Sequence, residues 1–373
     1  MKIHKKHWVT FLTCIITSIS FSQNYTSWND VETKRFGKET IYTSQTDSKP
    51  LHGSYKISEN SGAYADINFV NGKIDRAYIS YDFNGNKMSE ATYKAGKIEG
   101  KQVSYFQNGK VQDETFYKNG LKEGTWRTFN KKGEQIVLEN YANDKKEGKW
   151  VKQLKYPADN MVVTATEYYK NGEPTGHWKE LLDDGKLRSE KKYSAPTSYV
   201  EKTYYPNGKL SSEITIEDRK KNGVASYFTP EGLTKHKVNY ENDHVIYKEQ
   251  YFENGVLEAK TSYKYGKVNG LYQRYNQDGI KITEGTRKDT YKEGIWKIYE
   301  GKKGRLISEI NYKNNKQNGS AKFYDSKSKR VSQEGQYLNG KQDGQWKTYD
   351  ASGELIKEVE YGKGRKISEK TYN

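Results

Sequence analysis

The sequence is poor in cysteine, proline and apolar residues, and each shortage excludes a class of protein. Its 373 residues include 1 Cys and 6 Pro, and only 33% are hydrophobic. The single cysteine, Cys14, lies in the N-terminal segment, so the rest of the chain has no disulfide, no thiolate nucleophile and no cysteine metal site. The low apolar content leaves too little material for a deep core. We therefore expect a thin structure held by local packing and backbone hydrogen bonds.

Tyrosine and glycine, by contrast, are abundant, with 33 residues of each. Aromatic residues make up 14% of the chain, and because disordered proteins are poor in aromatics, the polar composition does not indicate disorder. Tyrosine combines an apolar ring with a hydroxyl that tolerates water, which suits a structure exposed on many sides. Frequent glycine with little proline favours short strands joined by tight turns.

The first 22 residues have the pattern of a secretory signal peptide. Three lysines precede an apolar stretch from Trp8 to Phe21, which small residues follow. This stretch of about 14 residues is too short for a bilayer, which needs about 20. We therefore expect cleavage between Ser22 and Gln23, export to the periplasm, outer envelope or medium, and no membrane span afterwards. Loss of the three lysines lowers the formal net charge from +16 to +13, which still favours acidic partners.

An aromatic residue recurs about every 24 residues along almost the whole chain. Successive copies begin at Phe69, Tyr93, Tyr117, Tyr141, Tyr169, Tyr193, Ile216, Tyr240, Tyr263, Arg287, Tyr312, Tyr337 and Tyr361, so that a non-aromatic residue takes this place in two of them. Such a period indicates an array of small units that bury their apolar faces only against one another. We therefore divide the chain into a signal peptide (1–22), an N-terminal cap or linker (23–45), about 12–13 repeats (46–361) and a C-terminal capping strand or tail (362–373).

The copy that begins at Tyr117 shows the pattern within one unit. With Tyr117 as position zero, glycine recurs at position seven and near sixteen, and an aromatic residue recurs near twelve. Two runs of strand-forming residues alternate with Asn-Gly, Asp-Gly or Lys-Gly pairs, which is the signal of β-hairpins with primed turns. Across the five-residue turn, Tyr105 should face Val111, and Tyr349 should face Leu355.

These hairpins in series predict an all-β fold. It is an elongated, twisted, single-layer antiparallel sheet of tandem hairpins of about 24 residues, similar to a solenoid. A sheet of this kind offers no deep cleft, which argues against a catalytic pocket.

The five tryptophans beyond residue 30 all fall at position nine of their copies. They are Trp126, Trp150, Trp178, Trp296 and Trp346. In one interpretation each ring packs against the next hairpin and closes the thin core, so that Trp296→Ala would cost about 3–5 kcal/mol. In the other, the rings form a line of exposed aromatics along a groove. These five residues are the candidate binding residues of the chain.

Three copies depart from the rhythm, at 155–160, 194–198 and 241–244. Insertions in repeat arrays map to loops on one face, and such loops often bind partners. The same departures are also consistent with tolerated drift.

Patterns for catalysis or metal binding are scarce. His236 and His244 lie eight residues apart, on a strand and in an irregular copy, and Asp183 and Asp184 lie where every copy has a turn. No phosphate-binding glycine loop and no nucleophile elbow are present. We therefore expect no enzyme activity, no cofactor and no metal. Basic charge with interleaved tyrosine would suit single-stranded nucleic acid, but export argues against that partner.

The copies YKNGLKEGTW at Tyr117, YLNGKQDGQW at Tyr337 and YKAGKIEG at Tyr93 resemble the MORN-repeat variant family, also labelled the YwqK-type antitoxin repeat. The resemblance covers roughly residues 46–373 and implies a β-hairpin array. The shorter MORN repeat has proposed roles in membrane-lipid association and protein scaffolding. The segment 81–85 is also similar to the YD repeats of large secreted toxin shells, which lack the Glu-Gly-x-Trp half.

Three functions remain open at this point. The first is an exported, non-enzymatic scaffold that presents repeated Tyr, Trp and Lys to a protein or to an anionic envelope polymer or lipid surface. The second is an antitoxin or immunity-type protein that neutralises a cognate toxin, as the family label suggests. The third is a carbohydrate-active or polysaccharide-binding protein, whose enzymatic form needs paired carboxylates in a cleft.

Overall fold

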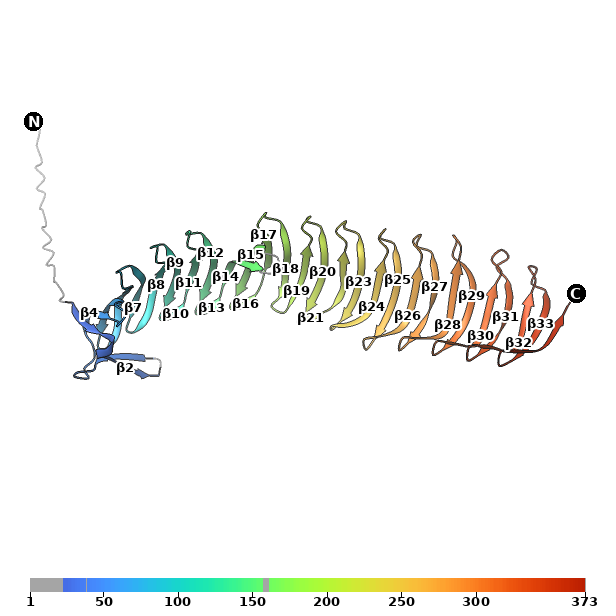
Figure 1. Ribbon diagram of the computed structural model, residues 1–373, viewed down its shortest axis with the longest axis horizontal. Coiled ribbons are helices and arrows are strands. Elements are labelled where there is room, and N and C mark those ends of the chain that lie inside the picture. The colour runs from blue at the N-terminus through green and yellow to red at the C-terminus, as the bar shows by residue number, and fades with distance from the viewer. Residues whose placement is uncertain (1–22, 38, 157–160, 373) are drawn as a thin grey trace, which may run out of the picture. The chain divides into compact units, whose positions relative to one another are not determined.

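The computed structural model describes residues 23–37, 39–156 and 161–372. The predicted signal peptide and part of the irregular segment 155–160 lie outside these residues. The described chain is almost entirely β-strand, with one short 3₁₀ element, η1 (Trp28–Asp30), and no α-helix (Figure 1). None of its described residues therefore belongs to a helix that could cross a membrane. The chain divides into two compact units, Met1–Gly148 and Lys149–Asn373.

Short strands follow one another as hairpins in both units. The strands up to the boundary are β1 (Asn24–Ser27), β2 (Val31–Phe36), β3 (Glu39–Ser44), β4 (Gly53–Ser58), β5 (Tyr64–Val70), β6 (Lys73–Tyr81), β7 (Lys87–Lys94), β8 (Lys97–Tyr105), β9 (Val111–Lys118), β10 (Leu121–Lys122), β11 (Gly124–Phe129), β12 (Gln135–Ala142) and β13 (Lys145–Lys146). The strands from the boundary onward are β14 (Gly148–Tyr156), β15 (Met161–Lys170), β16 (Glu173–Pro174), β17 (His177–Leu182), β18 (Leu187–Ala195), β19 (Ser198–Tyr204), β20 (Leu210–Glu217), β21 (Lys220–Lys221), β22 (Gly223–Phe228), β23 (Thr234–Glu241), β24 (His244–Tyr251), β25 (Leu257–Lys264), β26 (Lys267–Tyr275), β27 (Lys281–Lys288), β28 (Tyr291–Glu300), β29 (Arg305–Lys313), β30 (Lys316–Tyr324), β31 (Val331–Leu338), β32 (Lys341–Tyr349), β33 (Leu355–Gly362) and β34 (Arg365–Thr371).

Successive strands pair antiparallel within each unit. In the N-terminal unit, β8 pairs with β9 and sets Tyr105 opposite Val111. In the C-terminal unit, β32 pairs with β33 and sets Tyr349 opposite Leu355. Both predicted registers are therefore confirmed, as is the all-β hairpin architecture. An exception is β1, which runs parallel to β4.

One end of almost every hairpin is a two-residue turn in which both residues are left-handed; we call these turns the tips. At the tip after β9, φ is +52° for Asn119 and +80° for Gly120. A type I′ turn requires this pair of conformations, and glycine and asparagine adopt them at the lowest cost. The dipeptide signal is therefore confirmed at this tip, whereas tips such as Asn314-Asn315 contain no glycine.

Neighbouring tips are bonded to one another. The amide of Gly120 donates to the carbonyl of Ile98 in the preceding copy at 2.9 Å. The carboxylate of Glu99, at position six of that copy, accepts a second hydrogen bond from the amide of Asn119 at 2.6 Å. Carboxylates in the same role are Asp75, Glu123, Glu293 and Asp343. The tips of each unit therefore form a row with a fixed spacing.

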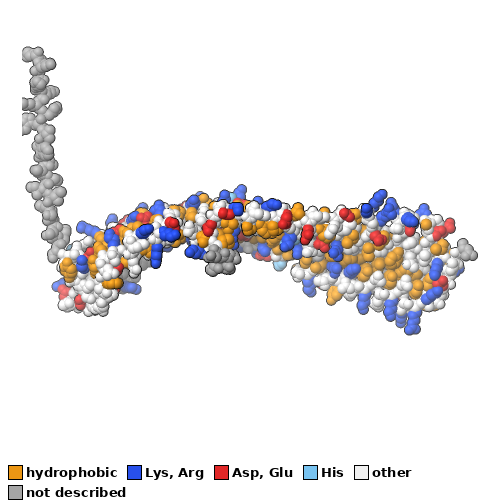
Figure 2. All heavy atoms as spheres, turned by 45° about the horizontal axis from the view of Figure 1, so that its top comes forward, with side chains coloured by type: hydrophobic (Ala, Val, Ile, Leu, Met, Phe, Trp, Pro, Cys, Tyr) orange, Lys and Arg blue, Asp and Glu red, His pale blue; other side chains and the backbone are white. Residues whose placement is uncertain are grey.

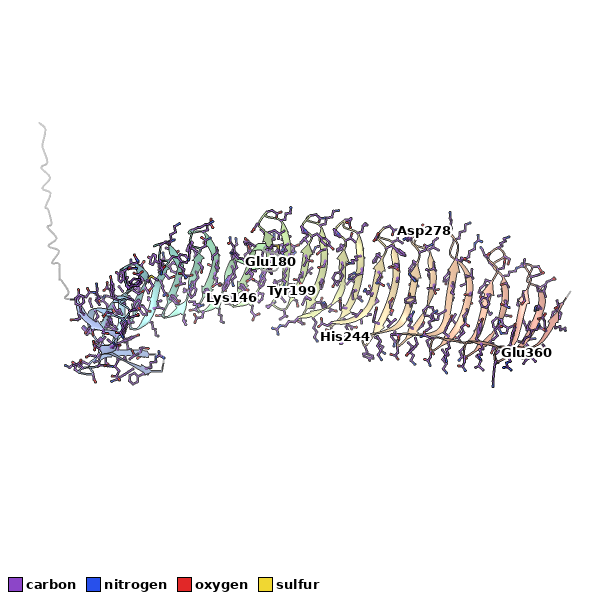
Figure 3. The ribbon with its side chains drawn as sticks, viewed as in Figure 1. Lys146, Glu180, Tyr199, His244, Asp278 and Glu360 are labelled. Atoms are coloured by element: carbon purple, nitrogen blue, oxygen red, sulfur yellow. The ribbon has the colours of Figure 1, made fainter. Side chains whose placement is uncertain are left out.

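The other ends of the hairpins are longer turns, which we call the loops. In the loop after β8, Phe106 donates its amide to the carbonyl of Lys110 at 2.8 Å, and Gly109 donates back to Phe106 at 2.9 Å. Gly109 is the position-sixteen glycine, and its φ of +77° is left-handed. Tips and loops lie along opposite edges of the C-terminal unit, as His244 beside a tip and Asp278 in a loop show in Figure 3.

Fully buried side chains are few, and the largest cluster lies at the start of the N-terminal unit. It consists of Val31, Leu51, Ile57, Ala65, Ile67, Phe69 and Ile74. Residues 23–45, the predicted cap or linker, form β1, η1 and the hairpin of β2 and β3. The amide of Tyr42 donates to the carbonyl of Gly72 at 2.7 Å, so this segment covers the first tip. The domain boundaries themselves stay predictions.

Candidate functional site

Each hairpin has two chemically different faces. Between β32 and β33, Trp346 stands opposite Val359, and the next pair, Lys347 and Glu358, stands on the other side. Directly opposed residues share a face, whereas successive residues alternate between faces. We call the first the Trp face and the second the Glu face.

The five candidate tryptophans differ in exposure. The exposed fraction is 2% for Trp150, 3% for Trp296 and 1% for Trp346. Trp126 and Trp178 are half-buried. Because the three buried rings offer no free face in the folded chain, the structure favours the packing interpretation for them. A binding role for Trp126 and Trp178 stays a prediction.

The indole nitrogen explains why tryptophan, and not another aromatic residue, recurs at position nine. Nε1 of Trp126 donates to the carbonyl of Phe116 at 3.0 Å, which lies ten residues earlier in the neighbouring strand. The same bond is made by Trp178, Trp296 and Trp346. The position-seven glycine precedes each of these rings with a left-handed φ, +68° at Gly124. Phenylalanine and tyrosine carry no donor at this place.

Two of the buried rings lie over glycines. A Cβ at Gly285 would lie 2.4 Å from Cδ2 of Trp296, and one at Gly335 would lie 2.3 Å from Cδ2 of Trp346. Neither glycine is among those with positive φ, so the backbone alone would accept any residue. The ring, rather than the chain conformation, therefore requires glycine. The half-buried Trp126 has Thr115 at the corresponding place, eleven residues earlier.

A lysine at position five lies over the aromatic rings of the Trp face. Nζ of Lys292 is 4.4 Å from the ring centre of Trp296 and 4.7 Å from that of Tyr312. Lys122 occupies the same place in the N-terminal unit. Burial among the rings, and then the charge of Arg287, lower the pKa of Lys292. These cations are bound to aromatic faces and complete the packing of the hairpins.

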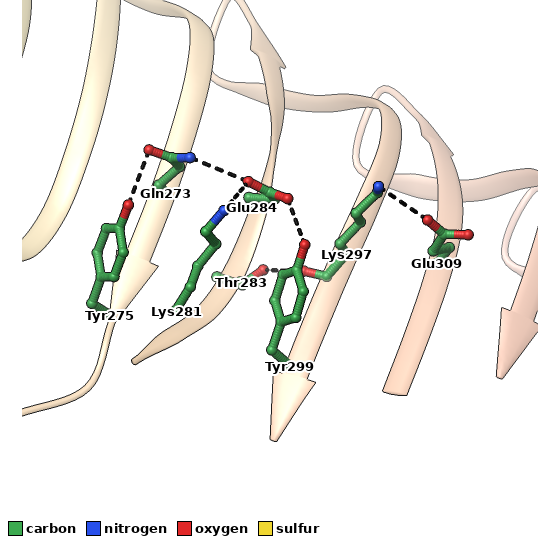
Figure 4. Close-up of polar contacts among 8 residues, drawn as sticks. All are labelled: Gln273, Tyr275, Lys281, Thr283, Glu284, Lys297, Tyr299 and Glu309. Carbon is green, nitrogen blue, oxygen red and sulfur yellow. Dashed lines mark hydrogen bonds and ion pairs between the residues drawn. The ribbon is translucent and has the colours of Figure 1, made fainter. Parts of the chain in front are cut away.

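The Glu face carries a network of carboxylates bound by tyrosine and lysine (Figure 4). Oε2 of Glu284 accepts from Nζ of Lys281 at 2.7 Å, and Oε1 accepts from the hydroxyl of Tyr299 at 2.5 Å. Nε2 of Gln273 adds a bond to the same carboxylate at 3.2 Å. The bond from Lys281, followed by that from Tyr299, lowers the pKa of Glu284 to about 2.

The tyrosine–glutamate bond recurs in both units. A tyrosine hydroxyl reaches a glutamate in the neighbouring copy in the pairs Tyr105–Glu90, Tyr204–Glu190, Tyr324–Glu309, Tyr349–Glu334 and Tyr372–Glu358. A carboxylate that accepts a phenol hydroxyl in this way joins two neighbouring copies and stabilises the sheet. The network therefore serves the fold.

A shallow hollow of about 520 Å³ lies on the Trp face of the N-terminal unit. It is lined by Gln102, Ser104, Asp113, Thr115, Tyr117, Trp126, Arg127, Thr128, Val137 and Glu139. Asp113 accepts hydrogen bonds from the hydroxyls of Ser104 at 2.9 Å and Thr128 at 2.7 Å. The hollow thus offers fixed polar groups beside one half-buried ring, which suits binding more than proton transfer.

The other candidates from the sequence do not converge on one site. His236 pairs with Gln250 along β23, whereas His244 pairs with Glu241 beside a tip. Asp184 lies in a loop, as predicted, and accepts from the amide of Lys186. Within the described ranges, no group of three His, Cys, Asp or Glu is placed to hold a metal ion.

Two of the irregular copies are described, and both close as short turns. At 194–198, Ala195 pairs with Ser198 across a two-residue turn that has no left-handed residue. At 241–244, Asn242 and Asp243 form an ordinary left-handed tip. Neither segment extends from the sheet as a long binding loop.

Comparison with protein families explains the hairpin unit. Residues 77–95, 98–119, 200–218, 247–265 and 342–363 match the MORN repeat variant family. The chain carries MORN-variant repeats. All five matched segments end at the first residue of a tip, at Ala95, Asn119, Asp218, Tyr265 and Lys363. A MORN-variant repeat in this protein is therefore the stretch from one tip through a loop to the next tip, and the chain is a repeat scaffold.

No curated protein matches the chain. Solved structures with some similarity include a Tc holotoxin pore of Photorhabdus luminescens, with 12% identity over 90% of this chain and 18% of that chain, and a TM-score of 0.18. Another is a TcdB2–TccC3 complex, with 11% identity over 87% of this chain and 18% of that chain, and a TM-score of 0.17. The chain thus spans about a fifth of the length of these structures.

The MORN-variant repeats also expose residues that the sequence reasoning missed. Tyr265 and Tyr291 lie at tips of the C-terminal unit, with exposed fractions of 88% and 49%. Both are surrounded in sequence by lysines. A signal was present, because the position that Tyr265 occupies is asparagine in most other copies. It was missed because tyrosine is common everywhere in this chain.

Proposed function

We propose that the chain is an exported, non-enzymatic repeat scaffold that binds an acidic protein or an anionic envelope polymer along its tips. The observation that carries the proposal is the separation of charge between the two edges of the C-terminal unit. The last five tips, at 263–269, 287–293, 312–318, 337–343 and 361–367, contain 11 Lys or Arg and 3 Asp or Glu, a net charge of +8. The five loops at 252–256, 276–280, 301–304, 325–330 and 350–354 contain 5 of each, a net charge of zero.

Two of the three acidic residues of these tips, which the net charge of +8 already includes, are hydrogen-bonded within the row. Glu293 is bound to the amide of Asn314, and Asp343 to the amide of Lys363, so both carboxylates point into the row of tips. A row of cations attracts an acidic partner over a distance of about 10 Å at moderate salt. Binding should therefore weaken as salt rises.

The absence of enzyme activity is part of the proposal. It is supported by the engagement of the carboxylates, since Glu284, Glu309 and Glu334 each accept a tyrosine hydroxyl of the neighbouring copy. Side chains fixed in this way contribute to stability and leave binding to the exposed tips. Export rests on the N-terminal sequence pattern and is tested by sequencing the N-terminus of the protein recovered from envelope fractions, which should begin at Gln23.

Capture from cell-envelope extracts tests the scaffold function. The chain from Gln23 onward, immobilised through a C-terminal tag, should retain acidic proteins or polymers at low salt and release them at high salt. A matched bait, in which six tip lysines are replaced by glutamine, should retain much less. Failure of the native bait to enrich any acidic component at low salt would contradict the proposal.

A further inference from the structure

Tyr265 adopts a conformation that is costly for its residue type. It is the first residue of a tip, with φ at +51°, where a bulky side chain is rarely found. The equivalent residue is most often asparagine, at Asn71, Asn119, Asn143, Asn171, Asn242, Asn314 and Asn339, and is otherwise Ala95, Asp218, Asp289 or Lys363, so that Tyr265 has the only aromatic ring at this position among the described tips. With 88% of its surface exposed, Tyr265 gains almost no packing in return. A strained backbone conformation that no packing contact compensates is typical of a functional residue.

One exposed lysine lies against this ring, and two more lie in the same tip and in the next one. Nζ of Lys264 lies 5.3 Å from the ring centre of Tyr265. Lys267 follows the same tip, and Lys288 begins the next one. Among the described residues, none of the three lysines has an ion-pair partner, so their charges are available to a ligand.

The tips that continue from Tyr265 hold further lysines in a regular row. The amide of Thr290 donates to the carbonyl of Val268 at 2.9 Å, and Gly340 donates to Gln317 at 2.8 Å, so each tip is fixed to the one before it. Consecutive tips are two strands apart, which is about 10 Å. Figure 2 shows Lys and Arg side chains projecting from this edge near the C-terminal end. The result is a line of cations that is one tip wide.

We propose that this tip edge binds a linear acidic polysaccharide, with the carboxylates of the polymer on the lysines and one sugar ring against Tyr265. The proposal rests on the proposed scaffold function and names its ligand class. A narrow row of cations matches a chain-like polyanion better than a flat surface. The apolar C–H face of a sugar can pack against an exposed tyrosine ring.

The distribution of aromatic residues separates this ligand from single-stranded nucleic acid. Sequence-independent binding of a nucleic-acid strand relies on aromatic rings that stack with successive bases. Of the five basic tips, only two carry an exposed aromatic residue within the turn or next to it, Tyr265 and Tyr291. Charge therefore dominates the row, and the ring adds a local contact.

Binding of polygalacturonate to the chain from Gln23 onward tests the proposal. Two triple variants remove the same charge from opposite edges: K264Q/K267Q/K288Q at the tips and K302Q/K303Q/K327Q at the loops. The tip variant should weaken binding about tenfold and reduce its salt dependence, whereas the loop variant should change it less than about twofold. Tyr265→Asn should weaken binding about fivefold and leave the fold at least as resistant to urea, because asparagine fits the tip.

Three outcomes would overturn the inference. Equal losses in the two triple variants would show diffuse attraction rather than an edge site. Tighter binding of oligo(dT), or of phosphatidylglycerol vesicles, with the same dependence on Lys264 and Tyr265 would assign the edge to another ligand class. Capture of an acidic protein through the tips without any binding of polygalacturonate would exclude an acidic polysaccharide as the ligand, whereas the proposed scaffold function would still hold.

Discussion

The contact between Trp296 and Gly285 gives a sharp test of how the repeats pack. Trp296 is 3% exposed, and its Nε1 donates to the carbonyl of Thr286 at 3.1 Å. A Cβ at Gly285 would lie 2.4 Å from the ring. A side chain at position 285 and the ring of Trp296 therefore exclude each other. In a double-mutant cycle, the effect of Gly285→Ala on the free energy of unfolding should change sign when Trp296 is replaced by alanine.

The magnitudes follow from burial and from the conformation of the glycine. Trp296→Ala should cost about 3–5 kcal/mol, because a buried ring and its hydrogen bond are lost. In the native background Gly285→Ala should cost about 1–3 kcal/mol through overpacking. In the Trp296→Ala background the same change should stabilise by about 0.5–1 kcal/mol, because alanine is the better strand residue and φ is not left-handed. The coupling is then about 1.5–4 kcal/mol.

The assay has to be local, because an array of repeats does not unfold as a single two-state unit. Hydrogen exchange of the amides in β27 and β28 reports the opening of this repeat, while amides in β18 and β19 of the same molecule serve as an internal reference. The pair Gly335 and Trp346 offers a second copy of the cycle, because a Cβ at Gly335 would lie 2.3 Å from Cδ2 of Trp346. If Gly285→Ala costs the same in both backgrounds, the ring is not the reason for the glycine, and the packing argument is wrong.

Further predictions concern the carboxylate network and the tips. The pKa of Glu284 is lowered to about 2. The ionised carboxylate therefore contributes its full stabilisation above the ordinary glutamate pKa, and this stabilisation is lost as pH falls toward 2. Urea titrations of Glu284→Gln and of the native chain should differ near pH 6 and converge near pH 2. Burial, and then the bond to Glu309, raise the pKa of Tyr324 to about 12. The contribution of the neutral hydroxyl to stability is therefore complete below pH 10 and is lost as pH rises toward 12. Tyr324→Phe should flatten this alkaline loss of stability, and an unchanged alkaline profile would contradict the assignment. Thr290 has φ at +77°, and Thr290→Gly should stabilise its repeat by about 1 kcal/mol in hydrogen exchange, whereas Gly340→Thr should destabilise its own by about 1–2 kcal/mol.

The parts of the fold that could be predicted are those encoded within one hairpin. Asn119-Gly120 specifies its tip by conformational preference, and the spacing of Tyr105 and Val111 specifies their pairing. Both signals are local, so the sequence alone was sufficient for them. The parallel pairing of β1 with β4 was not predicted, because it joins segments that no local pattern connects.

The contacts between neighbouring copies were only partly predictable. The position of each tryptophan indicated packing, but its bond to a carbonyl ten residues earlier depends on the chain path beside the position-seven glycine. No local pattern indicated that Gly285 and Gly335 lie beneath the rings of Trp296 and Trp346. The basic edge was hidden for another reason, because a net charge summed over the chain does not separate tips from loops.

The arrangement of the repeats explains why the tips are the natural place for function. The Trp face and the Glu face are occupied by contacts between neighbouring copies, so a substitution there disturbs two repeats at once. A tip is held by backbone bonds and by one carboxylate of the preceding copy, as Glu99 holds Asn119, and neither contact uses the side chain of this first turn residue. A first turn residue that tolerates a left-handed φ can therefore be exchanged with little cost to the fold, and a costly residue there calls for an explanation outside the fold. Tyr265 is such a residue, and a partner that contacts its ring and the adjacent lysines would supply the explanation.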